Sequence, residues 1–259
     1  MSTINEQAIE RGKKALKPGA LVNLPEKFLF VTISGAHLYG FPSADSDIDL
    51  RGAHILPRED FLRLSEPDET YESAGTIVDG IEVDCVSHDL KKYLRLLTKK
   101  NGYVLEQIFS PLVVFDGGQL DELRTLARGA MTRHVVHHYK GFFQTQEKLS
   151  LKDPAPTAKA VLYLFRVVMT GLHLLRTGEV EANILKLNEI YRLPFISDLV
   201  ARKTSGAEKG RLKPGEFQTL LSDAKALEAQ LDPASESSHL PETVQNLPAL
   251  DDFLLRMRR

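Results

Sequence analysis

Three aspartates stand at alternate positions in the segment SGAHLYGFPSADSDIDLRG, residues 34–52, between two apolar runs. On a β-strand the side chains of Asp47 and Asp49 project to one side, and the intervening apolar residue projects to the other. Two carboxylates held this close repel each other unless a cation lies between them. Oxygen ligands suit Mg²⁺, which also shares its coordination shell with phosphate oxygens. The pair therefore predicts a metal site that acts on phosphate, whereas Asp45, beside a Pro-Ser pair, favours a turn.

A third carboxylate is needed, because one strand supplies too few ligands for a two-metal centre. Runs 71–78 and 81–87 flank Asp79-Gly80, a pair that tolerates the positive φ of a tight hairpin turn. Asp84 lies on the return strand, where metal ligation explains a charge in the middle of an apolar run. Asp47, Asp49 and Asp84 are thus the predicted catalytic residues and metal ligands. Taken alone, the Ser-Asp-x-Asp run also fits a solvated turn or strand end.

The glycines ahead of the aspartates predict the other half of a phosphate site. A glycine after a buried strand lets the backbone approach a ligand, and backbone N–H groups at a helix start receive phosphate. If the strand is regular, Arg51 projects with the two aspartates and could orient a carboxylate or neutralise phosphate. The residues of this region that are predicted to bind the phosphate-containing ligand are Ser34, Gly35, Ala36, His37, Gly40 and Arg51. For His37, ligand contact and simple hydrogen bonding both remain open.

Strands must position these residues, and the first half of the chain contains the signals for them. Residues 27–34 and 46–56 are predicted strands, followed by the hairpin and by a helix over 89–100 with Asp89 as its N-cap. From about Leu120 the pattern becomes helical, over 121–149, 157–178, 181–193 and 216–231, with polar linkers over 201–215 and 232–248. We therefore expect an α+β (mixed α/β) domain over residues 1–120 and an all-helical domain over 121–259.

Composition limits the class of protein. The chain has 259 residues, a formal net charge of −2 and one cysteine, so a disulfide framework and a multi-cysteine zinc site are excluded. Its first residues lack the apolar core of a signal peptide, and no run approaches the roughly 18 apolar residues that span a bilayer. We expect a cytoplasmic protein with no membrane partner; the oligomeric state stays open.

These motifs resemble the DNA polymerase β-like nucleotidyltransferase superfamily, whose signature is a Gly-Gly or Gly-Ser turn, then Asp-x-Asp, then a third acidic residue. Here the signature is Gly35-Ala36, Asp47-Ile48-Asp49 and Asp84. The segment 34–52 together with EVDCVSHDLKKYLRLLTKKNGYVLEQIFSP is similar to predicted bacterial and phage nucleotidyltransferases that include the RNA-ligase-associated group. The narrow resemblance covers roughly residues 28–111. Ala36 departs from the pattern by lacking a hydroxyl, for which Ser34 or His37 could compensate.

The resemblance implies a polymerase-β-like head with a mixed sheet flanked by helices, and an activity. That activity is Mg²⁺-dependent transfer of a nucleoside monophosphate from a nucleoside triphosphate such as ATP to an acceptor hydroxyl, an RNA end, with release of pyrophosphate. Two ions are implied, with Mn²⁺ as a substitute, and RNA is the implied macromolecular partner. Three alternatives remain: transfer to a protein side chain (AMPylation, antitoxin-like), modification of a small molecule such as an antibiotic, and an inactive nucleotide-binding module.

Basic and histidine residues of the helical half carry weaker predictions. Lys159 and Arg166 lie two helical turns apart, and by analogy with related transferases they would grip the triphosphate; a solvated helix face is the alternative. The run HVVHH favours ordinary surface or interface histidines (His134, His137, His138) over a zinc site. The lysines and arginines of the predicted 201–215 linker could contact an RNA backbone or could simply be exposed to solvent: Arg202, Lys203, Lys209, Arg211 and Lys213.

Overall fold

The computed structural model describes residues 2–154, 156–206 and 210–259. By compactness these residues divide into two units. A sheet unit takes the chain up to Leu38, Asp45–Met131 and Thr243–Arg259, and a helical unit takes Tyr39–Ala44 and Thr132–Glu242. The predicted domains, 1–120 and 121–259, stay a prediction; compactness groups 121–131 and 243–259 with the sheet, because these segments pack on its helices.

The sheet unit is built on five strands in the order β3-β4-β2-β1-β5. β2 pairs with β4 in parallel, and the other neighbours are antiparallel. The strand bounds are β1 Phe28–Ile33, β2 Ile48–His54, β3 Thr70–Val78, β4 Ile81–Asp89 and β5 Val113–Asp116. The hairpin turn between β3 and β4 is the predicted one, since Asp79 and Gly80 both have positive φ, 49° and 78°. The predicted mixed sheet, followed by a helical region, is confirmed.

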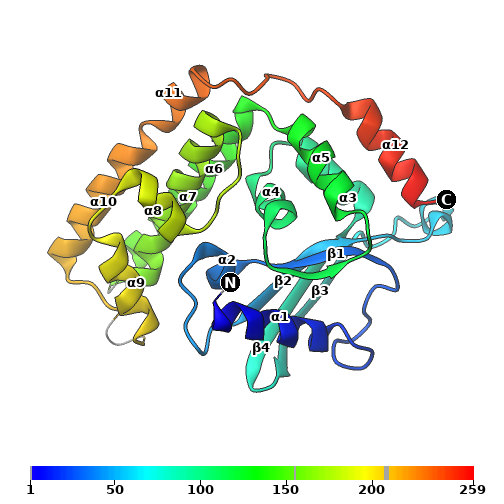
Figure 1. Cartoon of the computed structure of the whole chain (residues 1–259), viewed down its shortest axis with the longest axis horizontal. Helices are drawn as coiled ribbons and strands as arrows, with labels where there is room; N and C mark the ends of the chain where they lie inside the picture. The colour runs from blue at the N-terminus through cyan, green and yellow to red at the C-terminus, as the bar shows by residue number, and fades with distance from the viewer. Residues whose placement is uncertain (1, 155, 207–209) are drawn as a thin grey trace. The chain divides into compact units, whose positions relative to one another are not determined.

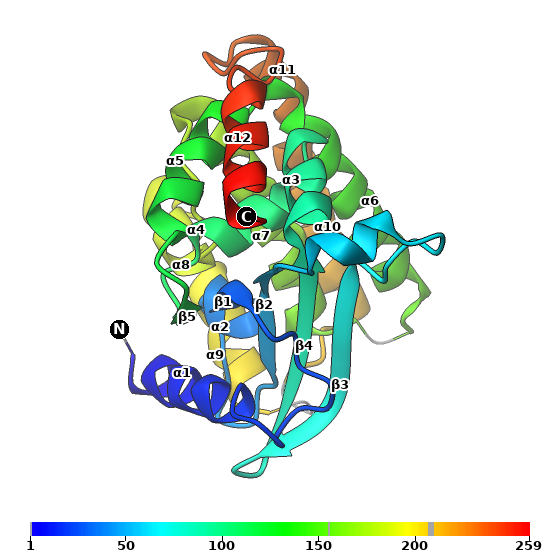
Figure 2. The same ribbon diagram turned by 90° about the vertical axis from the view of Figure 1, so that its right-hand side faces the viewer.

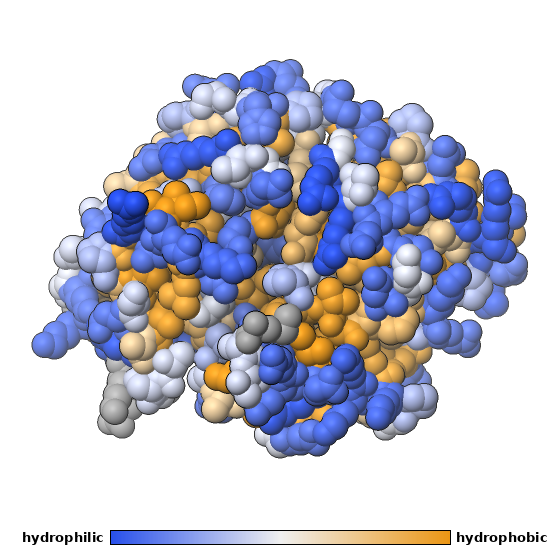
Figure 3. All heavy atoms as spheres, in the orientation of Figure 1, coloured by the Kyte–Doolittle hydropathy of each residue, from blue (hydrophilic) through white to orange (hydrophobic). Residues whose placement is uncertain are grey.

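One face of the sheet packs on helix α1, Thr3–Ala15 (Figures 1 and 2). Leu50, Val83 and Cys85 are fully buried on this face together with Ala8 and Ala15 of the helix. The inward side of α1 carries small residues, which lets the helix lie close to the sheet, and its outward side is hydrophilic (Figure 3). This face is therefore a closed apolar core, and the side chains of opposite parity lie on the other face.

Helices α3 and α4 cover part of that other face (Figures 1 and 2). Asp89 caps α3 as predicted, since its side chain accepts a hydrogen bond from the Lys91 N–H. Phe30 packs edge-on against Tyr93 of α3, and Thr32 donates to the carbonyl of Gln107 in α4. The remaining helical bounds of the sheet unit are α2 Gly35–Tyr39, η1 Arg58–Leu62, α3 Leu90–Thr98, α4 Gly102–Phe109, α5 Leu120–Ala130 and α12 Leu247–Met257.

Helix α7, Ala158–Thr177, is the centre of the helical unit, and α6, α8, α9, α10 and α11 all contact it. It ends at Gly178, the predicted C-cap, which adopts φ 75°. Length and composition alone would allow α7 to span a membrane, contrary to the sequence expectation, but 78% of its apolar window is buried within the protein. A core position accounts for that composition. The other bounds are η2 Arg133–Val135, α6 Val136–Lys152, α8 Ile184–Tyr191, α9 Ile196–Thr204, α10 Pro214–Glu228 and α11 Leu231–Glu236.

Three sequence-based boundaries are corrected. The helix predicted over 121–149 is interrupted between Ala130 and Val136, and α9 extends to Thr204 into the predicted 201–215 linker. The predicted 232–248 linker contains most of α11. The last two differences involve polar segments whose helices are stabilised by packing rather than by a strong local pattern. At the first, Met131 and Thr132 adopt an extended backbone between the two helices.

Candidate active site

Two of the predicted carboxylates lie side by side on neighbouring strands. In the parallel register of β2 and β4, Asp49 is the direct partner of Asp84. Neighbouring strands are about 4.8 Å apart, so both carboxylates emerge at one place on the sheet face opposite α1. Asp47 precedes β2 by one residue and is exposed, while Asp49 and Asp84 are half-buried. The fold thus brings Asp84 to Asp49, as the sequence predicted.

The glycine turn is fitted to the carboxylate of Asp49. Gly35 has φ 62°, and a Cβ built on it would lie 2.0 Å from Oδ2 of Asp49. The backbone N–H of Ser34 donates to the carbonyl oxygen of Asp49 at 2.8 Å, which joins the turn to β2. Only glycine satisfies both the positive φ and this close approach. The turn therefore presents its backbone directly beside the carboxylate.

The remaining residues of the turn have different surroundings. Ser34 is fully buried, and its hydroxyl has no hydrogen-bond partner among the described residues. Ala36 is half-buried, and Nδ1 of the buried His37 lies 3.1 Å from the Asn5 side-chain oxygen of α1. Gly40, with φ 90°, packs against Asn183, since a Cβ there would meet Oδ1 of Asn183 at 2.3 Å. Buried hydroxyl groups normally have a hydrogen-bond partner, so the Ser34 hydroxyl is a candidate for binding a polar ligand.

Arg51 is the counter-ion of Asp49. Its Nη2 donates to Oδ1 of Asp49 at 2.7 Å, and its Nη1 donates to the carbonyl of Leu50 at 2.8 Å. The Nε group donates to the hydroxyl of Tyr103 in α4 at 3.0 Å. One carboxylate oxygen of Asp49 thus meets Arg51 while the other faces Gly35. The sequence did not predict Tyr103, because it lies 52 positions from Arg51 and only tertiary packing brings the two together.

Asp84 accepts a hydrogen bond from the N–H of Gly75 at 2.9 Å. Gly75 has φ 71° and lies where the β3–β4 register shifts, between Ser73 and Thr76. Within the described part of the chain, no group of three or more His, Cys, Asp or Glu side chains is gathered closely enough to hold a metal ion. The donors are the oxygens that Mg²⁺ prefers, and Asp49 and Asp84 are adjacent, so the chemistry of the set fits such an ion. The three-ligand centre itself stays a prediction.

The two basic residues predicted on the helical half have different surroundings. Lys159 is exposed in the first turn of α7, whereas Arg166 is 2% exposed. The guanidinium of Arg166 lies 3.9 Å from the ring centroid of Tyr39 and also faces the ring of Tyr163. This geometry gives Arg166 a packing role through cation–π contact. Triphosphate binding by these two residues stays a prediction.

The other groups singled out in the sequence lie in ordinary surroundings. The rings of His134 and His137 stack at 6.0 Å, and burial lowers the pKa of His138 to about 4. Arg202 pairs with Glu216 at 2.5 Å, and Lys203 donates to Ser43 at 2.9 Å. In the same set, Arg211 and Lys213 are exposed, and Lys209 lies outside the described residues.

A second polar group lies on the carboxylate face and was not predicted. Oγ1 of Thr70 lies 3.1 Å from Nδ1 of His88 and accepts a hydrogen bond from Lys92. Burial lowers the pKa of His88, and the charges of Lys92 and Arg51 lower it further. The sequence could have indicated His88, because residues an even number of positions apart on a strand lie on the same face, and His88 follows Asp84 by four residues on β4. No local signal in the sequence connects it to Thr70 or Lys92.

Comparisons with known proteins extend over most of the chain. Residues 5–256 match the family model described as "RNA repair pathway DNA polymerase beta family". The uncharacterized protein MJ0002 of Methanocaldococcus jannaschii is 34% identical over 155 residues, which are 60% of this chain and 63% of that protein, less than two thirds of its length. The uncharacterized protein YcgL of Bacillus subtilis is 26% identical over 191 residues, 70% of this chain and 72% of that protein. A solved nucleotidyltransferase-like protein from Exiguobacterium sibiricum aligns with 90% of this chain and 74% of its own, at 14% identity and a TM-score of 0.33.

Proposed function

Because the chain belongs to the RNA repair pathway DNA polymerase beta family, a family of polymerase-β-like nucleotidyltransferases, we propose that it transfers a nucleoside monophosphate from a nucleoside triphosphate to the hydroxyl of an RNA end. In this reaction the acceptor oxygen forms a bond to the α-phosphorus. The bond from that phosphorus to the bridging oxygen breaks, and pyrophosphate leaves with the electron pair. The acceptor hydroxyl gives its proton to solvent.

One observation carries the proposal: Asp49 and Asp84 are direct partners in the parallel β2–β4 register, with Asp49 against the glycine turn. Nucleotidyl transfer needs carboxylates and phosphate-binding backbone within a few ångströms of each other, and this arrangement supplies both. Asp47, Asp49 and Asp84 would hold Mg²⁺ or Mn²⁺, which when bound lowers the pKa of the attacking hydroxyl and neutralises charge on the phosphates.

The residues of the chain have separable roles in this proposal. The buried hydroxyl of Ser34 and the backbone N–H groups that follow Gly35 would donate to phosphate oxygens. Arg51 would keep Asp49 oriented, since one oxygen of that carboxylate is bound to Arg51 and the other faces the turn. Backbone N–H donation explains how a turn with Ala36 in place of Gly or Ser could still receive phosphate.

RNA is proposed as the acceptor on the strength of the family description, which names an RNA repair pathway. A protein side chain, a small hydroxyl compound and the absence of transfer are alternative outcomes of the same experiment. The protein is incubated with each nucleoside triphosphate, radiolabelled at the α-phosphate, together with Mg²⁺ and RNA, DNA or cell lysate. Label in RNA supports the proposal. Label confined to protein or small molecules, or nucleotide binding without transfer, contradicts it.

Carboxylate variants test the metal ligands. Asp49→Asn and Asp84→Asn should each lower the transfer rate by about 100-fold or more, because metal stabilisation of transition-state charge is worth several kcal/mol. Glu82→Gln is the matched control: Glu82 is an exposed carboxylate on β4, two residues from Asp84, and its loss should leave the rate unchanged. Full activity in the Asp49 and Asp84 variants would show that these carboxylates are not the metal ligands of the reaction.

A further inference from the structure

Thr70, His88 and Lys92 converge from three elements of the sheet unit: β3, β4 and α3. The Thr70 hydroxyl links the other two, since its oxygen accepts from the Lys92 ammonium and lies 3.1 Å from Nδ1 of His88. Thr70 and His88 are direct partners in the antiparallel β3–β4 register. We call these three residues the Thr-His-Lys cluster.

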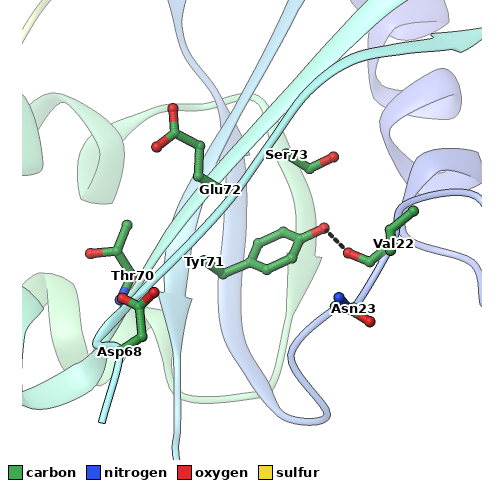
Figure 4. Close-up of a pocket in the computed structure, with 7 residues that line it drawn as sticks. All are labelled: Val22, Asn23, Asp68, Thr70, Tyr71, Glu72 and Ser73. Atoms are coloured by element: carbon green, nitrogen blue, oxygen red, sulfur yellow. Dashed lines mark hydrogen bonds between the residues drawn. The ribbon is translucent and has the colours of Figure 1, made fainter. Parts of the chain in front are cut away.

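The cluster lies on the same sheet face as the carboxylates. Asp84, Val86 and His88 alternate with the buried residues of β4, so they share a face, and Arg51 is the partner of Val86 on β2. Four residues of strand place His88 about 13 Å from Asp84 along β4. In Figure 4, Thr70 projects from β3 away from Tyr71, which points instead toward Val22. The carboxylates and the cluster therefore lie on one face of the sheet, with Arg51 and Val86 between them.

Lys92 gives the cluster a positive charge, while the carboxylates on either side of Thr70, those of Asp68 and Glu72, are exposed to solvent; Asp68 accepts a hydrogen bond from the Thr70 N–H at 3.0 Å. Among the described residues, the recorded hydrogen-bond partner of Lys92 is a neutral hydroxyl rather than a carboxylate. The charges of Lys92 and Arg51 both act on His88 and, after burial, contribute to lowering its pKa. The nearby carboxylate of Asp89 is fully buried and is bound to Arg258 and to the Leu56 and Lys91 N–H groups. It therefore does not neutralise Lys92.

One arrangement of protons in these hydrogen bonds leaves His88 with a donor for a ligand. An ammonium group only donates, so the Thr70 oxygen accepts from Lys92, and its single proton is available to Nδ1 of His88. With Nδ1 accepting, the neutral imidazole carries its proton on Nε2. The cluster then offers an ammonium group and an Nε2–H group, both of which are donors suited to a phosphate oxygen.

We propose that the Thr-His-Lys cluster is a phosphate subsite for the acceptor, binding a phosphodiester of single-stranded RNA whose terminal hydroxyl lies at Asp49 and Asp84. This inference rests on the proposed function and adds the surface that holds the acceptor. Contacts of this kind position a nucleic acid without selecting its sequence, so the subsite contributes affinity rather than base specificity.

Two adjacent lysines provide the test. Lys92→Gln removes the cluster's charge, and Lys91→Gln is the matched control, because the Lys91 ammonium lies 5.3 Å from the ring centroid of Phe61 instead of in the cluster. Binding of a short fluorescein-labelled single-stranded RNA is measured by anisotropy over a range of KCl concentrations. Lys92→Gln should weaken binding about 3- to 10-fold and reduce the slope of log K against log salt by about 0.7, the value for one phosphate contact on a single strand. Lys91→Gln should change neither quantity.

Two further variants test the geometry and the sign of the charge effect. Thr70→Val removes the linking hydroxyl without changing charge and should weaken RNA binding less than Lys92→Gln does. Glu72→Gln removes an exposed carboxylate on the same side of β3 as Thr70 (Figure 4) and should tighten binding. Melting temperatures close to the wild-type value confirm that each variant is folded.

The transfer assay separates failure of this inference from failure of the proposed function. The expected result is that Lys92→Gln raises KM for RNA and leaves KM for the nucleoside triphosphate unchanged. If RNA is labelled normally but Lys92→Gln and Lys91→Gln behave alike, the subsite is refuted and the function stands. If the wild-type protein neither labels nor binds RNA, both are refuted. If the protein binds single-stranded DNA as tightly as single-stranded RNA, the cluster is still a phosphate subsite but is not specific for RNA.

Discussion

At the scale of single residues, the carboxylate of Asp49 is held from both sides. Arg51 binds one oxygen, and the Cα of Gly35 is close to the other. Arg51 also donates to the hydroxyl of Tyr103, so a tyrosine on α4 is linked through Arg51 to a carboxylate on β2. Such indirect positioning is important at catalytic centres, where a displacement of about 1 Å can cost as much as 100-fold in rate.

Tyr103→Phe removes only the hydroxyl that fixes Arg51. We expect the free energy of unfolding to fall by about 1 kcal/mol, the usual net value of one hydrogen bond, and kcat for nucleotidyl transfer to fall about 3- to 10-fold. The control is Tyr71→Phe, which loses the 2.9 Å hydrogen bond to the Val22 carbonyl shown in Figure 4. Urea unfolding and label incorporation measure the two quantities. Equal kcat in both variants would contradict the positioning role.

At the scale of elements, local signals predicted the pieces of the site but not their assembly. The positive φ of Asp79-Gly80 and the alternation of buried residues on β4 depend on neighbouring residues, so the hairpin and the face of Asp84 could be predicted. The parallel pairing of β2 with β4, the short strand β5 and the position of α4 depend on long-range contacts. Tyr103, Thr70 and Lys92 therefore could not be assigned to the site from the sequence.

The pairing of β2 and β4 also makes stability depend on pH. His54, at the end of β2, is buried, and its Nδ1 lies 2.9 Å from the hydroxyl of Ser87 on β4. Burial lowers the pKa of His54 to about 4, against 6.5 for an exposed histidine. Between these pH values the unfolded chain binds a proton at His54 that the folded chain does not. The contribution of His54 to the free energy of unfolding is therefore fully present above pH 6.5 and is lost as the pH decreases toward 4.

We expect this histidine to contribute about 3 kcal/mol to the loss of stability across that window. His54→Gln, whose amide can still hydrogen-bond to Ser87, should show a smaller difference between the free energies of unfolding at pH 7 and pH 4. His138, in the helical unit, has the same lowered pKa and a separate environment, so His138→Gln should reduce the difference independently. If the His54→Gln and wild-type curves are parallel, His54 does not contribute to the pH dependence.

At the scale of the whole molecule, the chain leaves the sheet unit after Met131 and returns to it at Thr243. The returning segment is tied to α5, where Asn246 donates to the carbonyl of Leu126 at 2.8 Å. Near its end, Arg258 pairs with Asp89, the N-cap of α3, and its guanidinium lies 4.0 Å from the ring centroid of Phe61. We therefore expect the stability of the sheet unit to depend on this C-terminal segment, a dependence that no local pattern reveals.

Arg258→Gln tests this dependence, because Asp89 is fully buried while the arginine that neutralises it is 12% exposed. Removing one partner of a buried ion pair leaves an uncompensated charge, and we expect a loss of about 3 kcal/mol in the free energy of unfolding, moderated by the two backbone N–H groups that Asp89 still accepts from. Arg256→Gln is the control, two residues away on the same segment. Its pair with Glu122 is 47% and 44% exposed, so its loss should cost less than about 1 kcal/mol. Equal losses in urea unfolding would show that the Arg258–Asp89 pair behaves as a surface contact and that the sheet unit does not depend on the returning segment through it.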